Sequence, residues 1–247
     1  MTILTSTKDM RKIRSSGDVL KKVFSYVEAK IVPGISTLEL DRYVEKIIRE
    51  SDAVPAFKGY KGFPASICAS VNEVVVHGIP SDEVVLREGD IISVDVGAKK
   101  NGFFTDATRT FSVGKISSEA ERLIDVARKC LEAGIEQAIA GSRLSNISHA
   151  IEKVAQKAKL KEVRTFVGHG VGKNLHEAPE VPNWGERGKG PVLKEGLVLA
   201  IEPMINSGTR DIDIRSDGWT AVTRDGRLSA HFEDTIIVGQ KEAEIIT

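Results

Sequence analysis

The chain has 247 residues, and its 35 Lys plus Arg residues equal its 35 Asp plus Glu residues, so the formal net charge at pH 7 is zero. A chain of this length forms one large domain or two of about 120 residues, and either buries a substantial core. Zero net charge provides no overall field that would attract nucleic acid or an anionic membrane, so we expect neither as a partner.

The sequence lacks the features of an exported protein. Cys68 and Cys130 are its two cysteines, too few for the disulfide framework of a small secreted domain. Charged residues come too early at the N-terminus for a signal peptide, and no apolar run reaches the length of about 18 residues that spans a membrane. We therefore expect a cytoplasmic protein, and we expect it to be a monomer.

The first half of the chain predicts two helices followed by strands. Residues 8–30 place apolar side chains at roughly the 3.6-residue period of an amphipathic helix, which ends at Pro33-Gly34. Ser36 with Glu39 three residues later forms a capping-box pattern that predicts the start of a second helix. Residues 54–114 then change to strands and loops, with Gly and Pro at the turns.

The most informative stretch of this half is an apolar strand that ends in an acid. Residues 91–94 run directly into Asp95, and an Asn101-Gly102 turn signal precedes a second acid at Asp106. A hairpin centred on that turn pairs Asp95 with Thr108 and places Asp106 on the same face. Such diagonal neighbours lie about 7–8 Å apart, so their carboxylates repel each other unless a bound cation compensates the charge.

The same pattern recurs at a constant offset in the second half. Residues 193–202 match residues 86–95, so that Glu202 matches Asp95 at an offset of 202 − 95 = 107. A helix opened by Ser118 and Glu121 and running to about Ala140, and another around residues 147–154, precede strands over most of residues 163–238. We predict one α+β domain over residues 1–247, with pseudo-repeats at about 8–114 and 115–240, a central sheet and helices on one face.

Further candidates for an acidic metal site lie downstream. Glu202 ends its strand at Pro203, Glu233 lies in the apolar strand of residues 230–238, and His169 stands between two glycines. Four carboxylates balance two divalent ions, and oxygen-rich ligation with one imidazole suits Mn, Fe or Co. Taken singly, each residue has a plainer interpretation, such as a strand-edge acid or a hydrogen-bonded loop histidine.

Together these residues fall in motifs by which the chain resembles the type I methionine aminopeptidases, from about residue 8 to residue 246. The motifs are Ser70-Val71-Asn72-Glu73-Val74-Val75-Val76-His77-Gly78-Ile79-Pro80, Asp95-Val96, Gly102-Phe103-Phe104-Thr105-Asp106, Gly168-His169-Gly170-Val171-Gly172, Leu175-His176-Glu177, Ile201-Glu202-Pro203-Met204 and Phe232-Glu233-Asp234-Thr235. The resemblance implies the pita-bread fold, in which helices cover a central antiparallel sheet with internal pseudo-two-fold symmetry. The 31 residues from Glu202 to Glu233 lack the helical insertion typical of type II members.

The resemblance also implies a set of site residues. The implied metal ligands are Asp95, Asp106, His169, Glu202 and Glu233, with Asp106 and Glu233 bridging. His77 and His176 would contact the scissile peptide, and Glu202 would also transfer protons. The implied methionine pocket consists of Phe57, Tyr60, Phe63, Cys68, Leu175 and Trp219. A monovalent-cation site, for Na or K, would map to Asn72, Val74 and Ser229. The chain departs from the usual family pattern at Phe57, Leu175 and Asp234.

The implied activity is removal of the N-terminal methionine from nascent proteins and peptides with a small second residue. A hydroxide bridging two divalent ions (Co, Mn, Fe or Zn) would attack the carbonyl, and transient association with the ribosome is expected of the family. Two alternatives remain. A proline-specific pita-bread peptidase usually carries a large N-terminal domain, whereas only about seven residues precede the first helix here. A non-catalytic binding module would have lost its ligands, whereas all are present.

Overall fold

A computed structural model describes residues 1–247. The four α-helices are α1 (Thr7–Glu28), α2 (Thr37–Glu50), α3 (Ser118–Ile135) and α4 (Ser145–Lys157), and a single 3₁₀ turn covers Tyr60–Gly62. The strands are β1 (Val54–Pro55), β2 (Ile67–Val71), β3 (Val74–Val76), β4 (Ile91–Lys100), β5 (Phe103–Ser112), β6 (Lys161–Glu162), β7 (Gly168–Gly170), β8 (Glu177–Val181), β9 (Val198–Ile201), β10 (Met204–Asn206), β11 (Ile212–Ile214), β12 (Ala221–Thr223), β13 (Ser229–His231), β14 (Glu233–Ile237) and β15 (Glu244–Ile245).

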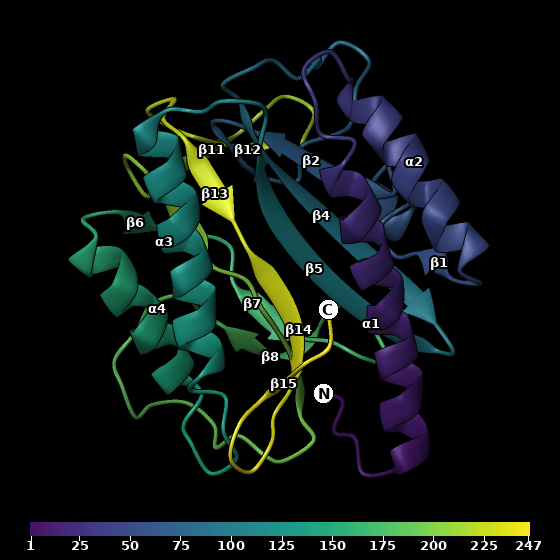
Figure 1. The fold of residues 1–247 in the computed structure, drawn as a ribbon. Helices are drawn as coiled ribbons and strands as arrows, with labels where there is room; N and C mark the ends of the chain where they lie inside the picture. The colour runs from purple at the N-terminus through teal and green to yellow at the C-terminus, as the bar shows by residue number, and fades with distance from the viewer.

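A nine-stranded antiparallel sheet forms the centre of the molecule (Figure 1). Its order is β1-β4-β5-β14-β9-β7-β8, with β2 also paired to β4 and β15 to β14. Two three-stranded sheets, β13-β10-β6 and β11-β12-β3, lie beside it. The long β4–β5 hairpin of the first half therefore lies next to strand β14 of the second half, and β14 pairs in turn with β9.

All four helices cover the same face of the central sheet (Figure 1). The buried side of α1 and α2, which includes Leu20 and Leu40, packs on Ile92 and its neighbours in β4. The buried side of α3 and α4, which includes Leu123, packs on Ile201 and other residues of the second half. The amphipathic periods read from the sequence are the cause of this layering, because each helix has one apolar face to bury. The predicted α+β architecture with helices on one face is confirmed.

The helix starts agree closely with the sequence in the first half and less well in the second. Ser36 caps α2 through the predicted reciprocal hydrogen bonds with Glu39. α3 begins at Ser118, as predicted, but the residue that caps it is Ser117, whose side chain accepts the hydrogen bond from the backbone N–H of Ala120. The predicted continuation of α3 to Ala140 was wrong: the chain leaves the helix at Ile135, and the N–H of Ala140 donates to Gly239 instead.

The strands of the second half are shorter than predicted. Loops separate short strands between residues 163 and 238, so strands do not occupy most of this segment. Residues 230–238 do not form one strand, because β13 ends at His231 and β14 begins at Glu233 in a different sheet. The N–H of Phe232, between them, donates to the carbonyl of Pro203. Because of this break, β14 is separate from β13 and begins at Glu233.

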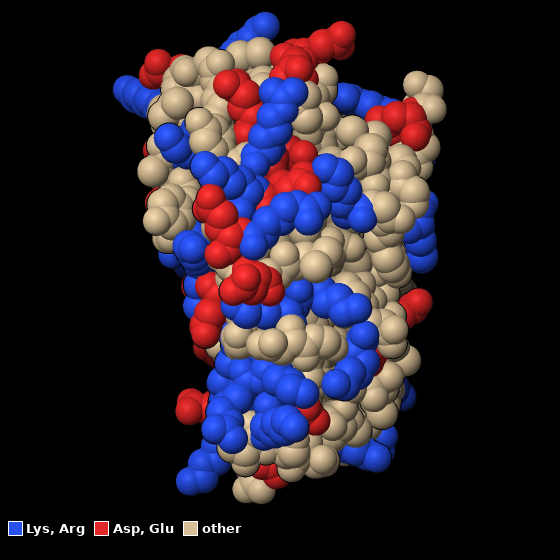
Figure 2. All heavy atoms as spheres, turned by 90° about the vertical axis from the view of Figure 1, so that its right-hand side faces the viewer, with Lys and Arg blue, Asp and Glu red and all other residues tan.

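The surface over α1 and α2 carries charges of both signs (Figure 2). Glu45 on α2, for example, accepts from Lys58 at 2.7 Å and forms an ion pair with Arg49 at 2.8 Å. Such a mixed surface follows from the equal numbers of acidic and basic residues in the sequence. None of the helices combines the length and apolarity that a membrane crossing requires.

Candidate metal centre and substrate pocket

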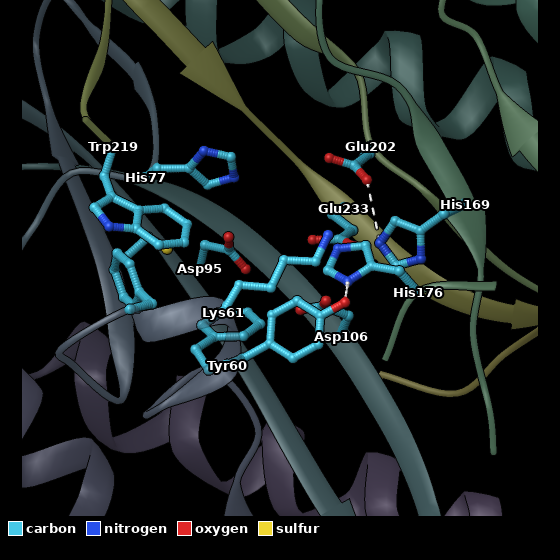
Figure 3. Close-up of a pocket in the computed structure, with 13 residues that line it drawn as sticks. Tyr60, Lys61, His77, Asp95, Asp106, His169, His176, Glu202, Trp219 and Glu233 are labelled. Carbon is cyan, nitrogen blue, oxygen red and sulfur yellow. Dashed lines mark hydrogen bonds and ion pairs between the residues drawn. The ribbon is translucent and has the colours of Figure 1, made fainter. Parts of the chain in front are cut away.

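Five predicted ligand residues lie on, or directly after, five neighbouring strands of the central sheet. In sheet order they are Asp95 on β4, Asp106 on β5, Glu233 on β14, Glu202 immediately after β9, and His169 on β7. Residues from both halves of the chain therefore meet on one face, opposite the face that the helices cover (Figure 3). Four of these residues belong to strands and the fifth directly follows one, so the sheet holds their backbones in place.

The register of the strands brings the side chains together. The hairpin pairs Asp95 with Thr108, as the Asn101-Gly102 turn predicted, and Thr108 in turn pairs with Glu233. One ligand atom from each of Asp106, His169 and Glu233 lies within 4.8 Å of the other two.

His169 is oriented by its own backbone neighbourhood. Its Nδ1 lies 2.9 Å from the carbonyl oxygen of Gly170, so Nδ1 carries the proton and donates to that acceptor. The lone pair of the neutral ring is then on Nε2, which faces Glu202 Oε1 at 3.4 Å (Figure 3). The two flanking glycines are required by close packing, because a Cβ on Gly168 would lie 2.5 Å from the carbonyl oxygen of Ala200.

Hydrogen bonds behind the carboxylates fix their positions. Thr108 Oγ1 donates to Glu233 Oε2 at 2.9 Å, within the buried part of the site. Thr235 Oγ1 donates to the carbonyl of Asp106 at 2.8 Å and accepts from its N–H at 2.9 Å. Such supporting contacts orient ligand side chains in metal sites. The cross-strand threonines therefore give the acids a defined geometry.

The electrostatics of the site call for a cation. Burial raises the pKa of Asp95 to about 7. Burial, with repulsion from neighbouring carboxylates as the next cause, raises the pKa values of Asp106, Glu202 and Glu233 well above the usual range. Asp95 Oδ1, Asp106 Oδ1 and Glu233 Oε1 are buried without a hydrogen-bond partner. Unpaired buried carboxylate oxygens on several strands are the donor set that a divalent cation requires, so the residues present fit such ions.

A cavity of about 180 Å³ lies over these acids. Its apolar wall comes from Phe57, Tyr60, Phe63, Cys68 and Trp219, all of them residues of the predicted methionine pocket. The Phe63 and Trp219 rings meet edge to face, with centroids 5.2 Å apart. Leu175, also predicted to line this pocket, is buried in the same apolar cluster but does not line the cavity.

His77 and His176 stand at the cavity above the acids (Figure 3). His176 Nδ1 lies 3.0 Å from the Tyr60 hydroxyl, and the two rings stack. Burial, with positive neighbours adding to it, lowers the pKa of His176 to about 3, so this ring is neutral near pH 7. His77 has a φ of 59°, an unusual value outside glycine, and its ring meets Phe166 edge to face. Backbone strain of this kind is concentrated at functional sites.

The residues predicted to bind a monovalent cation lie close to one another, where β13 meets the turn before β3. The N–H of Ser229 donates to the carbonyl of Asn72 at 2.9 Å, while Ser229 Oγ is buried without a hydrogen-bond partner. Val74 is the first residue of β3.

Three residues near the acids were missed in the sequence. Lys61, on the turn after Tyr60, extends into the cavity (Figure 3). Thr108 supports Glu233, and the hairpin register that placed it opposite Asp95 could have identified it. His231 is buried with its Nε2 3.7 Å from Glu202 Oε2. In a continuous strand, a residue two positions before Glu233 would have its side chain on the same face, which was a signal in the sequence. The signal is weakened because the chain breaks between β13 and β14, so the alternation of a single strand does not apply.

Acids and a histidine that gather on a sheet below an apolar cavity define a metal-dependent hydrolase. A family model described as metallopeptidase family M24 matches residues 11–240, and the chain belongs to this family. Its activity therefore depends on divalent metal ions.

Curated relatives match over the full length of the chain. A protein named methionine aminopeptidase from Clostridium acetobutylicum is 47% identical over 247 residues, which cover 100% of this chain and 99% of the relative. One named methionine aminopeptidase 1 from Bacillus subtilis is 46% identical with the same coverage.

Solved structures agree with the fold. The crystal structure of a methionine aminopeptidase from Thermotoga maritima superposes with a TM-score of 0.97 at 41% identity and covers 100% of this chain and 99% of that one. A prolidase from Pyrococcus furiosus shares the fold at a TM-score of 0.79 and 21% identity, and this chain covers 65% of it. The predicted pita-bread fold is confirmed.

Proposed function

We propose that the chain is a metalloaminopeptidase that removes the N-terminal methionine from nascent proteins and peptides with a small second residue. The observation that carries the proposal is the direct contact between the acidic cluster and an apolar cavity walled by aromatic rings and a thiol. Relatives named methionine aminopeptidase that match along the whole chain support the same activity.

Asp95, Asp106, His169, Glu202 and Glu233 would hold two divalent ions, with Asp106 and Glu233 bridging them. Four carboxylates carry a charge of −4, which two such ions balance, and the neutral imidazole adds a directional ligand. This donor set suits Mn, Fe or Co, and Zn also tolerates it. Bound ions of this kind polarise a carbonyl group and lower the pKa of water.

The chain's own groups would then manage the protons and the substrate. Glu202 would accept a proton from the attacking water and deliver it to the leaving amine. The Tyr60 hydroxyl would donate a hydrogen bond to His176 Nδ1, which would leave the Nε2–H free to stabilise the developing oxyanion. His77 would steady the scissile nitrogen.

The cavity wall would select methionine. A thioether side chain is unbranched and polarisable, so it adapts to an irregular wall of aromatic carbon and sulfur. Phe57, Tyr60, Phe63, Cys68 and Trp219 would contact it, with Leu175 packed behind them. The small volume of the site would favour a small second residue.

Other parts of the proposal concern the surroundings of the enzyme. A monovalent cation, Na or K, would bind at Asn72, Val74 and Ser229, which the unpaired Ser229 Oγ supports. The enzyme would act as a cytoplasmic monomer that associates transiently with the ribosome.

Peptide turnover tests the proposal. Protein reconstituted with Mn²⁺, Fe²⁺, Co²⁺ or Zn²⁺ in turn should release methionine from Met-Ala-Ser and leave an Xaa-Pro peptide intact. Metal analysis of protein purified without added metal would identify the ion that the cell supplies. Preference for the Xaa-Pro peptide would instead assign a proline-specific peptidase. Absence of both metal binding and turnover, unchanged by Asp106→Asn, would indicate a binding module.

A further inference from the structure

His231 is a buried histidine outside the predicted ligand set. It is the last residue of β13, its side chain is almost fully buried, and its Nε2 has no hydrogen-bond partner. That nitrogen lies 3.7 Å from Glu202 Oε2, while Glu202 Oε1 faces His169 Nε2 at 3.4 Å. The Glu202 carboxylate therefore lies between two imidazoles, one facing each oxygen.

The position of His231 is fixed by its backbone. Its N–H lies 3.0 Å from Thr110 Oγ1 and 3.3 Å from Ser93 Oγ, and Thr110 Oγ1 lies 2.8 Å from its carbonyl oxygen. It also pairs with Met204 across the β10–β13 ladder. The backbone that carries the ring is therefore held in place. A polar ring held without a partner costs free energy that an apolar side chain of similar size would not.

The chemistry of the two groups determines what they can do together. A neutral imidazole has one N–H, and an ionised carboxylate only accepts hydrogen bonds. Hydrogen bonds in such sites are often long in the free protein and shorten when the site is complete.

We propose that His231 is a positioning residue whose Nε2–H donates to Glu202 Oε2 and so holds Glu202 Oε1 toward His169. This inference rests on the metal centre of the proposed function. A carboxylate held on one side by His231 presents a single oxygen to the ions and keeps the orientation that proton transfer requires. His231 acts through Glu202 and does not itself touch the substrate.

Two substitutions distinguish the effect of the hydrogen bond from the effect of the imidazole ring. His231→Leu removes the donor, whereas His231→Gln keeps an N–H at a similar reach. His149→Leu is the matched control, because His149 on α4 contacts the carbonyl of Gly185, away from the acids. Mn²⁺ binding to chelator-treated protein, measured by titration calorimetry, gives a readout that needs no peptide. Thermal unfolding of each variant reports whether it folds.

We expect His231→Leu to weaken Mn²⁺ binding about 10- to 100-fold and to lower kcat on Met-Ala-Ser more than it changes KM. His231→Gln should restore most of the affinity, and His149→Leu should bind Mn²⁺ like the parent. In a Glu202→Gln background, His231→Leu should have no further effect on binding, since the residue acts through Glu202.

Three outcomes would overturn the proposal. Unchanged Mn²⁺ binding and kcat in a folded His231→Leu would show that the contact has no role. Equal losses in His231→Gln and His231→Leu would indicate that the imidazole itself is a ligand. Equal losses in the parent and the Glu202→Gln background would show that His231 acts independently of Glu202. If the parent binds Mn²⁺ but does not cleave Met-Ala-Ser, the proposed function fails while the binding test of His231 still stands.

Discussion

The buried carboxylates predict an unusual dependence of stability on pH when metal is removed. Burial raises the pKa of Asp95 to about 7, and the pKa values of Asp106, Glu202 and Glu233 lie well above the usual range. In chelator, these groups hold protons in the folded state that they release on unfolding. A raised carboxyl pKa contributes stability below the unfolded pKa, and that contribution is lost as pH rises toward the folded pKa.

The histidines determine the pH range in which this effect can be measured. Burial lowers the pKa values of His176 and His231 to about 3, and those of His77 and His169 are also lowered. Below an unfolded pKa of about 6.5, these rings take up protons on unfolding and oppose the carboxyl effect. Above about pH 7.5 the histidines are almost entirely neutral in both states, so the carboxyls set the slope.

The expected magnitude follows from linkage. Each carboxyl that stays protonated in the folded state lowers the free energy of unfolding by about 1.4 kcal/mol per pH unit. From about pH 7.5 to about pH 8.5, the chelated protein should therefore lose about 1.4 kcal/mol for each such group. Excess Mn²⁺ should abolish the decline, because metal binding requires the ionised carboxylates and stabilises the folded state.

Urea unfolding at several pH values, with chelator and with Mn²⁺, measures both curves. Asp106→Asn should make the slope in chelator shallower by about 1.4 kcal/mol per pH unit, because one titrating group is removed. Asp18→Asn, at an exposed position on α1, should leave the slope unchanged. A chelated protein whose stability stays constant or increases between these pH values would refute the reasoning.

Three further substitutions test how the site is supported. Thr108→Val removes the hydroxyl that donates to Glu233 Oε2. It should weaken Mn²⁺ binding, measured by calorimetry, about 10-fold. Unchanged affinity would show that Thr108 does not orient Glu233 for the metal. Gly170→Ala places a Cβ 2.3 Å from the carbonyl oxygen of Ala178 and should lower the free energy of unfolding by about 1–3 kcal/mol; an unchanged urea midpoint would contradict this packing. Asp41→Ala leaves the buried N–H groups of Ser66 and Ile67, at the start of β2, without their carboxylate acceptor. It should lower the free energy of unfolding by about 1–3 kcal/mol and raise KM for Met-Ala-Ser, whereas an unchanged KM would show that α2 does not position the pocket.

The local parts of the site could be predicted from the sequence because their signals are local. The Asn101-Gly102 turn fixes the register of one hairpin, and that register places Asp95 and Asp106 on a common face. The capping box at Ser36 likewise depends on residues three positions apart.

The remaining parts depend on contacts between distant segments. Nothing near Glu233 in the sequence specifies that β14 lies beside β5 or that the chain changes sheet at Phe232. Beyond the end of α3, the N–H of Ala140 donates to the carbonyl of Gly239, about 100 residues away in the chain. The sequence offered Glu233 and His169 as candidates and the resemblance gave them roles, but neither indicated the contacts of Thr108 with Glu233 or of His231 with Glu202, which exist only in the folded sheet.

The order of strands in the central sheet has a consequence for when the enzyme becomes active. The β4–β5 hairpin can form early, because its strands are joined by a short turn. The hydrogen bond from Thr108 to Glu233, by contrast, closes a separation of 125 residues. A chain leaving the ribosome thus carries Asp95 and Asp106 long before β14 is available to complete the site. Activity should consequently arise only after nearly the whole polypeptide has been synthesised, so an incomplete chain would not process other proteins.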